Sequence, residues 1–382
     1  MIFVSSLVSI IVVLDVVFAS VVPDVTHVNN NVGIAVFQSF NLDDNLVVSP
    51  PVATASLVTL LMAAKGESAD ALRTALEMTP KTDEKSFSSL LKPISEIKSS
   101  QRLISSEKPK KDFKTIAKQL ESEIISIDFS SKQSAKDLTL WSLNASDGRI
   151  AVKDILDSKQ QLISIGVVVA KFTVPMRPDP RERDFHNFVS YSFPGMASRI
   201  PFFSTETELK SKDFSEEKSI SVLIDLNQDL SLFLVLPKTS EDLEFLNENL
   251  TQSLLEKMIS ETTKTTAKNM RLIVPQIRVE SEIDLKDVFE ELNSNFDFSK
   301  GFDSKTEIKV SNVLQKVALE VSAEDQDEDQ DQNDKDEPTP GVPELVFDRP
   351  FVFALLTSSG TTVLLGRIQS LFDEKVLSFQ FI

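Results

Sequence analysis

The segment Ala323–Glu337, AEDQDEDQDQNDKDE, limits how this chain can fold more than any other feature of its sequence. Nine of its fifteen residues are acidic and one is a lysine, so its net charge is −8. Because burying an unpaired carboxylate is costly, this acidic segment cannot belong to a core. It nevertheless separates two apolar stretches, VSNVLQKVALEV and ELVFDRPFVFALL. The sequence therefore predicts buried strands on either side of an exposed, disordered acidic loop, residues 323–343.

The rest of the composition is typical of one large globular domain. The chain has 382 residues, of which 41% are hydrophobic, and no linker or internal repeat divides it. We expect a single domain over residues 20–382, present as a monomer. The net charge of −18 argues against nucleic acid and anionic membranes as partners, because proteins bind both through Lys and Arg. A cationic protein partner for the acidic loop remains open.

The first nineteen residues predict a secretory signal peptide. Their apolar run is interrupted at Asp15 and ends in a small-residue cleavage site at Ala19. A retained membrane anchor is the competing interpretation, but it would need roughly 18 uninterrupted apolar residues. We therefore expect a secreted, extracellular glycoprotein with glycosylation sequons at Asn144 and Asn249. Because the chain has no cysteine, packing without disulfides must stabilise it.

Groups that could carry catalysis or bind metal are scarce. The chain has two histidines, His27 and His186, and no cysteine, which is too few for a zinc site. Neither a nucleophile elbow nor a phosphate-binding loop occurs. Asp325, Asp327 and Asp329 have the spacing of a calcium loop, but Gln330 replaces the glycine that such a loop needs. We predict no enzyme activity, no cofactor and no specific metal site.

One basic cluster stands out against the acidic background. It contains Lys108, Lys110 and Lys111, followed by Lys114 and Lys118. These charges would suit a sulfated polysaccharide, but the simpler interpretation is the solvated start and face of a helix.

Hydrophobic patterning predicts a mixed α+β fold, with helices concentrated in the first part and strands towards the end. Ser49 and Pro50 are the residue types found at a helix N-terminus. Helices are expected at 49–64, 66–76 and 241–259, and a helix ending in the turn Asp147-Gly148 within 137–150. Strands are expected at 161–174 and 308–321, a strand pair at 219–237, and a closing hairpin within 344–371. A helix runs into a strand over 112–128, and a strand into a helix over 269–292.

These segments, in this order, resemble the serpin superfamily over nearly all of the mature chain. FDRPFVFALLTSSGTTVLLGRIQSL looks like the family's closing hairpin, with its Arg-Pro-Phe and terminal Gly-Arg. NLVVSPPVATASLVTLL resembles the family's Asn-x-x-x-Ser-Pro helix, and WSLNASDGRI resembles its helix that begins with Trp, here Trp141. The resemblance implies an α+β serpin fold with three β-sheets, about nine helices and an exposed reactive-centre loop.

In a serpin the acidic segment would be the reactive-centre loop, which a protease cuts and which then inserts into the largest sheet. Inhibitory members resemble one another in a Glu-Glu-Gly-Thr hinge followed by small residues. The aligned hinge positions here are Ala323, Glu324, Asp325, Gln326, Glu328, Asp329 and Gln330. Neither strand face of this segment is apolar, so insertion would bury charges and bring like charges together. The resemblance therefore predicts a loop that does not insert.

The sheet that would have to open also departs from the family pattern. The resemblance places its sliding region at Ser49, Val52, Gly166 and Gln315, where Val52 replaces a serine, Gly166 an asparagine and Gln315 a histidine. A tryptophan expected after the central strand is missing, with Val174 near its place. The family's loop length puts the scissile bond at Thr339–Pro340, and proline after the bond is poorly accepted by most serine proteases.

Three functions follow from this resemblance. We expect a non-inhibitory member of the serine protease inhibitor family. The alternatives are a suicide-substrate inhibitor of a serine or cysteine protease that cuts near Thr339, and an extracellular carrier of a cationic or hydrophobic ligand.

Overall fold

The computed structural model describes residues 24–64, 66–79, 82–108, 111–179, 187–191, 197–292, 309–323 and 339–371. The predicted signal peptide, His186, and the hinge positions from Glu324 to Gln330 lie outside these residues.

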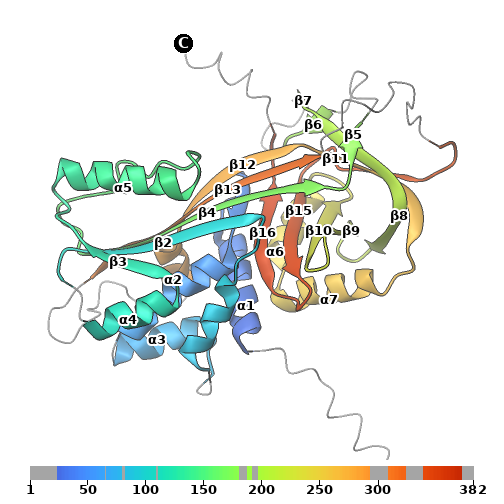
Figure 1. Ribbon diagram of the computed structural model, residues 1–382. Helices are drawn as coiled ribbons and strands as arrows, with labels where there is room; N and C mark the ends of the chain where they lie inside the picture. The colour runs from blue at the N-terminus through green and yellow to red at the C-terminus, as the bar shows by residue number, and fades with distance from the viewer. Residues whose placement is uncertain are drawn as a thin grey trace, which may run out of the picture.

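The described part of the chain contains eight α-helices and one 3-10 helix. They are α1 (Asp24–Ser39), α2 (Pro50–Ala63), α3 (Glu67–Ala75), η1 (Glu84–Leu91), α4 (Lys111–Gln119), α5 (Lys132–Ala145), α6 (Asp242–Asn249), α7 (Gln252–Thr263) and α8 (Leu285–Leu292). Helices α1, α2, α3 and α4 lie together at one end of the molecule (Figure 1).

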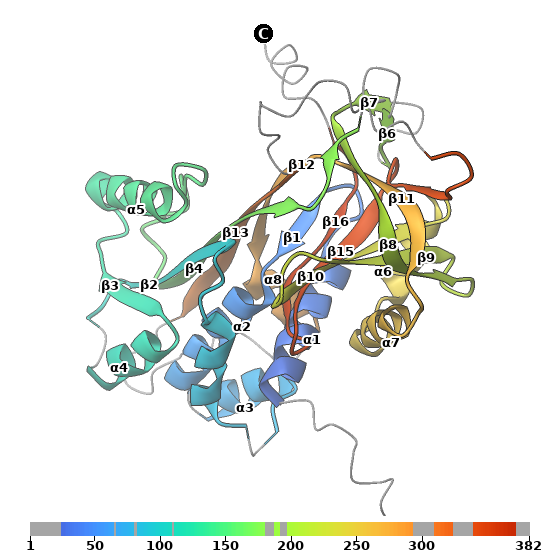
Figure 2. The same cartoon turned by 45° about the vertical axis from the view of Figure 1, so that its right-hand side comes forward.

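A five-stranded sheet forms one half of the framework. Its order is β12–β13–β4–β2–β3, and β4 and β13 are parallel neighbours at its centre. In the two views α5 covers one face of this sheet and α2 lies against the other (Figure 2). The strands are β2 (Ile97–Ser105), β3 (Ser122–Ser126), β4 (Leu162–Val174), β12 (Ile277–Asp284) and β13 (Val310–Ala323).

A nine-stranded, strongly bent sheet forms the other half, with the path β1–β16–β15–β10–β9–β8–β11–β14 and with β5 beside β8. A two-stranded ribbon of β6 and β7 completes the described strands. They are β1 (Leu46–Val48), β5 (Arg177–Pro178), β6 (Asn187–Val189), β7 (Ala197–Arg199), β8 (Phe202–Phe214), β9 (Ser219–Asp225), β10 (Leu230–Pro237), β11 (Lys268–Pro275), β14 (Glu344–Val346), β15 (Phe351–Thr357) and β16 (Thr362–Ile368).

One buried arginine links the closing hairpin to the end of α1. Arg367 on β16 is fully buried and donates hydrogen bonds to the carbonyls of Phe37, Phe40 and Asn41 at the end of α1, and to Asn247 Oδ1 at 2.7 Å. The last carbonyls of a helix have no partner within that helix, so the guanidinium satisfies them. Burial lowers the pKa of Arg367 to about 10. This residue is the arginine of the Gly-Arg pair in the sequence.

The α+β prediction and its three sheets are confirmed, but two expected elements were wrong in detail. The helix expected at 241–259 is two helices, because Thr251 caps α7 by accepting a hydrogen bond from the Leu254 amide. The strand expected to follow residue 269 is two strands, β11 and β12, which separate at Gln276 and join different sheets. Ser49 does occupy the N-cap of α2, but its side chain makes no capping hydrogen bond.

Candidate functional site

The candidate site is the seam between β4 and β13, the two parallel strands at the centre of the five-stranded sheet. They are paired from Val310 with Leu162 to Ala323 with Val174, with one irregularity between Val310 and Asn312. By the resemblance to serpins, a cut reactive-centre loop would have to enter here. The seam is closed along its full length in this structure.

The four predicted sliding-region residues come together at the middle of the seam, Gly166 and Gln315 within it and Ser49 and Val52 at the start of α2, against one face. Gln315 and Gly166 are paired across it. Gln315 is buried, and its side-chain amide accepts from the backbone N–H of Ser49 and donates to its carbonyl, both at 2.9 Å. Gln315 therefore ties β13 to the N-cap residue of α2, Ser49, whose hydroxyl makes no capping hydrogen bond.

Val52 and Gly166 fit each other closely. A methyl group added at Gly166 would lie 2.6 Å from Val52 Cγ1, closer than carbon atoms approach in real contacts. The side chain of Val52 is 2% exposed and belongs to the apolar cluster between the two sheets. The valine therefore occupies the space that the glycine leaves over the centre of β4.

Two further residues of this row were missed by the sequence reasoning. Gln101 on β2 is paired with Gly166 from the other side, so two glutamines flank the glycine in one row across the sheet. The Ser56 hydroxyl on α2 donates to Gln101 Oε1 at 3.1 Å, and both residues are buried. Ser56, a polar residue one helical turn after Val52 in a mostly apolar helix, could have indicated a buried hydrogen bond. Its partner, Gln101, could be identified only from the fold.

An ion triad crosses the seam on its other face. Glu320 on β13 lies opposite Lys171 on β4, with Lys171 Nζ and Glu320 Oε1 3.2 Å apart. Arg149, which follows α5, also donates to the Glu320 carboxylate. Burial alone would raise the pKa of Glu320, but the hydrogen bonds from Arg149 and Lys171 outweigh it and lower that pKa. The triad joins both strands of the seam to the covering segment, which is α5 and the turn after it, residues 132–150.

A second ion pair holds the same covering segment. Lys98 Nζ on β2 lies 2.5 Å from Asp147 Oδ1, in the turn that ends α5. The backbone of this turn has positive φ at Asp147 and Gly148, as the Asp-Gly pair in the sequence indicates. The covering segment is thus fixed to the sheet on both sides of β4.

The predicted scissile bond lies in a tight turn before β14. The amide of Val342 donates to the Thr339 carbonyl at 3.2 Å, with Pro340 and Gly341 between them and φ of +88° at Gly341. Proline followed by a residue of positive φ is the pattern of a type II turn. Thr339 and Pro340 are exposed. The Thr339 backbone amide also donates to Glu206 Oε2 at 3.3 Å, and hydrogen bonding to the Thr339 side chain is the largest cause that lowers the pKa of Glu206.

The other candidate residues lie away from the seam. Asn144 and Asn249 are both exposed. His27 is on α1, with Nδ1 3.1 Å from Gln252 Nε2 at the start of α7 and Nε2 3.6 Å from Glu77 Oε2. In the basic cluster, the side chains of Lys108, Lys114 and Lys118 are exposed.

Two other kinds of feature are absent from the part of the chain that the structure describes. No group of three His, Asp or Glu side chains there could hold a metal ion. None of the helices in those ranges is long and apolar enough to cross a membrane.

Comparison with known proteins gives a consistent result. A family model described as "Serpin (serine protease inhibitor)" matches residues 27–371. Human Serpin I2 is 24% identical over 323 residues, which cover 77% of this chain and 78% of that protein. Serpin B5 of Xenopus laevis is 26% identical over 365 residues, which cover 84% of this chain and 90% of that protein.

Two solved structures have a similar fold. Native protease nexin-1 with heparin has a TM-score of 0.74 and 18% identity, and the match covers 91% of this chain and 99% of that one. Human thyroxine-binding globulin in its thyroxine complex has a TM-score of 0.77 and 16% identity, and the match covers 92% of this chain and 100% of that one.

Proposed function

Because the chain belongs to the serpin family, we propose that it is a non-inhibitory member, a secreted protein whose acidic loop stays in solvent. One observation carries this proposal: buried apolar side chains pack on both faces of the seam along its middle. On one face Ile165 and Val167 of β4 pack in the cluster that includes residues of α5. On the other face Val168 and Ala170 pack in the cluster shared with the nine-stranded sheet. A strand inserted between β4 and β13 would place alternate side chains in each cluster.

The acidic segment offers carboxylates to both faces. Asp325, Asp327 and Asp329 have one parity along a strand, and Glu324 and Glu328 have the other. Each unpaired carboxylate buried there costs several kcal/mol or must take up a proton. Even two such burials would consume a large share of a typical folding stability of about 5–15 kcal/mol. No choice of register removes this cost.

The conformation of the Thr339–Pro340 bond supports the same proposal. Proteases bind the residues around a scissile bond in extended form, whereas Thr339 here begins a hydrogen-bonded turn. Pro340 supplies no backbone N–H to a protease. Both features disfavour attack at the bond that the family's loop length selects.

The melting temperature before and after cutting the loop tests the proposal. The mature chain is cut with a Glu-specific protease, mass spectrometry places the cut within 324–337, and circular dichroism follows thermal unfolding. We expect the melting temperature to stay unchanged within about 2 °C, because the cut loop remains in water. A rise of roughly 10 °C or more, equivalent to several kcal/mol, would mean that the loop inserts. Protease inhibition would then become the better-supported function. A covalent complex with a serine or cysteine protease that survives denaturing electrophoresis would establish it.

Secretion and glycosylation belong to the same proposal. Residues 1–19 support export, and the exposed side chains of Asn144 and Asn249 leave room for glycans. Ser146 of the first sequon is buried in the fold, so its glycan would have to be added before folding. A protein recovered from the medium of eukaryotic cells, with two mass shifts on deglycosylation, is the expected result. Retention in the cell would contradict it.

A basic protein is the partner that the charge of the loop favours. The acidic segment has a net charge of −8, and association of this kind weakens as salt is added. We expect capture of a basic partner to fall steeply between low and physiological salt and to be lost on deletion of residues 324–337. Binding that survives the deletion would place the partner elsewhere on the protein.

A further inference from the structure

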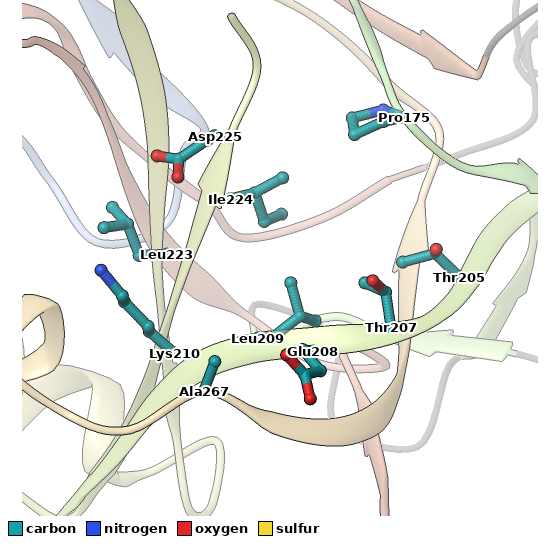
Figure 3. A pocket seen from close by; sticks show the side chains of 10 residues that line it. All are labelled: Pro175, Thr205, Thr207, Glu208, Leu209, Lys210, Leu223, Ile224, Asp225 and Ala267. Carbon is teal, nitrogen blue, oxygen red and sulfur yellow. The ribbon is translucent and has the colours of Figure 1, made fainter. Parts of the chain in front are cut away.

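A cavity of about 310 Å³ opens between β8 and β9, where β8 leaves β9 and pairs with β11 instead (Figure 3). Its lining contains one ammonium group, from Lys210, and two carboxylates, from Glu208 and Asp225. Because side chains alternate along a strand, Lys210 and Glu208 lie on the face of β8 opposite Leu209. Nothing in this lining selects one class of ligand, and the exposed faces of two helices are the more informative surface.

Two exposed apolar side chains stand in the same relation to the two glycosylation sequons. Among the described residues, three large apolar side chains are exposed, Leu140 at 57%, Phe245 at 37% and Val189 at 37%. Leu140 lies four residues before Asn144 on α5, and Phe245 lies four residues before Asn249 on α6. Single exposed apolar residues are common on protein surfaces, but chance would seldom place two of three at the same offset from the two sequons of the chain.

The four-residue offset brings each asparagine over its apolar neighbour. In an α-helix residues i and i+4 share a face, with Cβ atoms about 5–6 Å apart, and the Cα–Cβ bonds tilt towards the N-terminus. The side chain of Asn144 therefore leans towards Leu140, and that of Asn249 towards Phe245. Both asparagines are exposed in the last turn of their helices, so a sugar attached to either has access to the apolar residue one turn earlier.

On α6 a hydrogen bond fixes the direction of the asparagine amide. Asn249 Nδ2 donates to the Phe245 carbonyl at 2.7 Å. A glycosylated asparagine keeps one N–H on Nδ2, so this bond can persist while the sugar replaces the other hydrogen. Lys218 approaches Phe245 from the first turn of α6, with Nζ 5.3 Å from the ring centroid and 3.3 Å from Asp242 Oδ1. Asn249 lies on the turn beyond the ring, so the sugar and the lysine approach Phe245 from different ends of the helix.

N-acetylglucosamine, the first sugar of an N-linked glycan, has the surface that such a side chain needs. The C–H groups of its ring and its acetyl methyl group are apolar, whereas its hydroxyls can point to water. The face of an aromatic ring carries partial negative charge and attracts polarised C–H groups, and covering Leu140 removes apolar area from water. The contact stabilises the folded state, because only the helix holds the sugar and the side chain one turn apart.

We propose that the first N-acetylglucosamine of each glycan packs on the apolar side chain one turn before its asparagine, on Leu140 from Asn144 and on Phe245 from Asn249. This inference rests on the glycosylation proposed above and adds that the two glycans are part of the folded surface and stabilise it. It is independent of the acidic loop and of whether the chain inhibits a protease.

Thermal unfolding with trimmed and with removed glycans tests the proposal. The protein is secreted from eukaryotic cells that make only high-mannose glycans, and each site is studied alone, in an Asn249→Gln or an Asn144→Gln background. Endoglycosidase H leaves one N-acetylglucosamine on the asparagine, and peptide N-glycosidase F removes it. We expect loss of this last sugar to lower the melting temperature by about 2 °C or more, the shift that a modest apolar contact gives in a large domain.

The comparison with variants of the apolar residue identifies the contact. In Leu140→Ser, removal of the sugar from Asn144 should lower the melting temperature less than half as much, and Phe245→Ser should have the same effect at Asn249. Leu140→Met keeps an apolar side chain and should retain the full loss. The second enzyme converts asparagine to aspartate in every form, so this change cancels. Each site is the control for the other, because α5 and α6 lie in separate parts of the molecule (Figures 1 and 2).

Equal losses with and without the apolar side chain would overturn the proposal, and so would a sugar whose removal leaves the melting temperature unchanged. In both cases the glycosylation itself would stand. Mass spectrometry of the intact protein comes first, because unoccupied sequons would overturn the glycosylation and this inference together. That result would leave the proposal of a non-inhibitory serpin unaffected.

Discussion

Replacing Gly166 with alanine should destabilise the protein through a single contact, the one with Val52. The new methyl group would lie 2.6 Å from Val52 Cγ1, below the 3.0 Å that real Cβ contacts respect. Overpacking of this kind costs about 1–3 kcal/mol. Alanine recovers about 0.5–1 kcal/mol relative to glycine, because the unfolded chain loses freedom. We therefore expect a net loss of about 1–2 kcal/mol in the free energy of unfolding.

A double-mutant cycle tests this contact by also truncating its other partner, Val52. Val52→Ala deletes two buried methyl groups, which should cost about 2 kcal/mol for transfer and the cavity left behind. In that background the methyl group introduced by Gly166→Ala enters the vacated space without a clash. Gly166→Ala should then be neutral or slightly stabilising, so the two substitutions should show a coupling energy of about 1–2 kcal/mol.

Urea-induced unfolding of the wild type, both single variants and the double variant measures this coupling. Gly166→Ala combined with Val58→Ala is the matched control, because Val58 is equally buried on α2 but belongs to another apolar cluster. That pair should be additive within about 0.5 kcal/mol. Additivity in the Val52 pair would refute the reasoning, since it would mean that α2 shifts freely over β4 and that the two residues are not matched.

Three other substitutions test the structure at separate points. Glu320→Gln should cost about 1–3 kcal/mol at pH 7. Because the folded-state pKa of Glu320 is lowered, its contribution is complete above the ordinary carboxyl range and is lost as the pH falls below about 4. Urea unfolding at pH 7 and pH 3 should therefore show the difference from wild type shrink. Glu282→Gln is the control and should cost less, because its pair with Lys316 joins β12 to β13 outside the seam and Glu282 is exposed. Gln315→Ala should lower the free energy of unfolding by about 2–3 kcal/mol in the same assay, because it removes both hydrogen bonds to the Ser49 backbone and leaves buried groups without partners. A decrease of less than about 0.5 kcal/mol would contradict this role. Arg367→Lys should lower the free energy of unfolding by about 3 kcal/mol or more, since one ammonium group cannot reach all the carbonyls at the end of α1. Near wild-type stability would show that the forked geometry of the guanidinium is dispensable.

The sequence predicted the local elements better than the partners across the sheet. Strand 161–174 and the closing hairpin are rich in apolar and β-branched residues and are bounded by turn residues, so their positions followed from local composition. The break at Gln276 was missed because LIVPQIRVE reads as one continuous strand, and only the divergence of two sheets divides it. The break at Thr251 had a local signal, a residue type that caps helices, which the amphipathic pattern on both sides concealed.

Some residues of the candidate site were predicted from the sequence, and others could be found only from the fold. Ser49, Val52, Gly166 and Gln315 were placed by family resemblance, and the structure brings them to one row between α2 and the seam. The ion triad was not predicted, because Glu320 and Arg149 are separated by 171 positions and each reads as an ordinary charged surface residue. Only the parallel pairing of β4 with β13 places the carboxylate opposite Lys171 and within reach of the turn after α5.

A graft can separate the contribution of the loop from that of the seam. We expect that replacing residues 324–331 with an alanine-rich segment will not by itself restore insertion, because the Val52–Gly166 contact and the ion triad still hold β4 and β13 together. Combining the graft with Val52→Ser and Glu320→Gln weakens the seam at its centre and on its other face. After cleavage of the loop, the combined variant should gain roughly 10 °C or more in melting temperature, and the graft alone should gain much less. A full gain with the graft alone would mean that the seam opens readily, and that the acidic residues of the loop are the sole barrier.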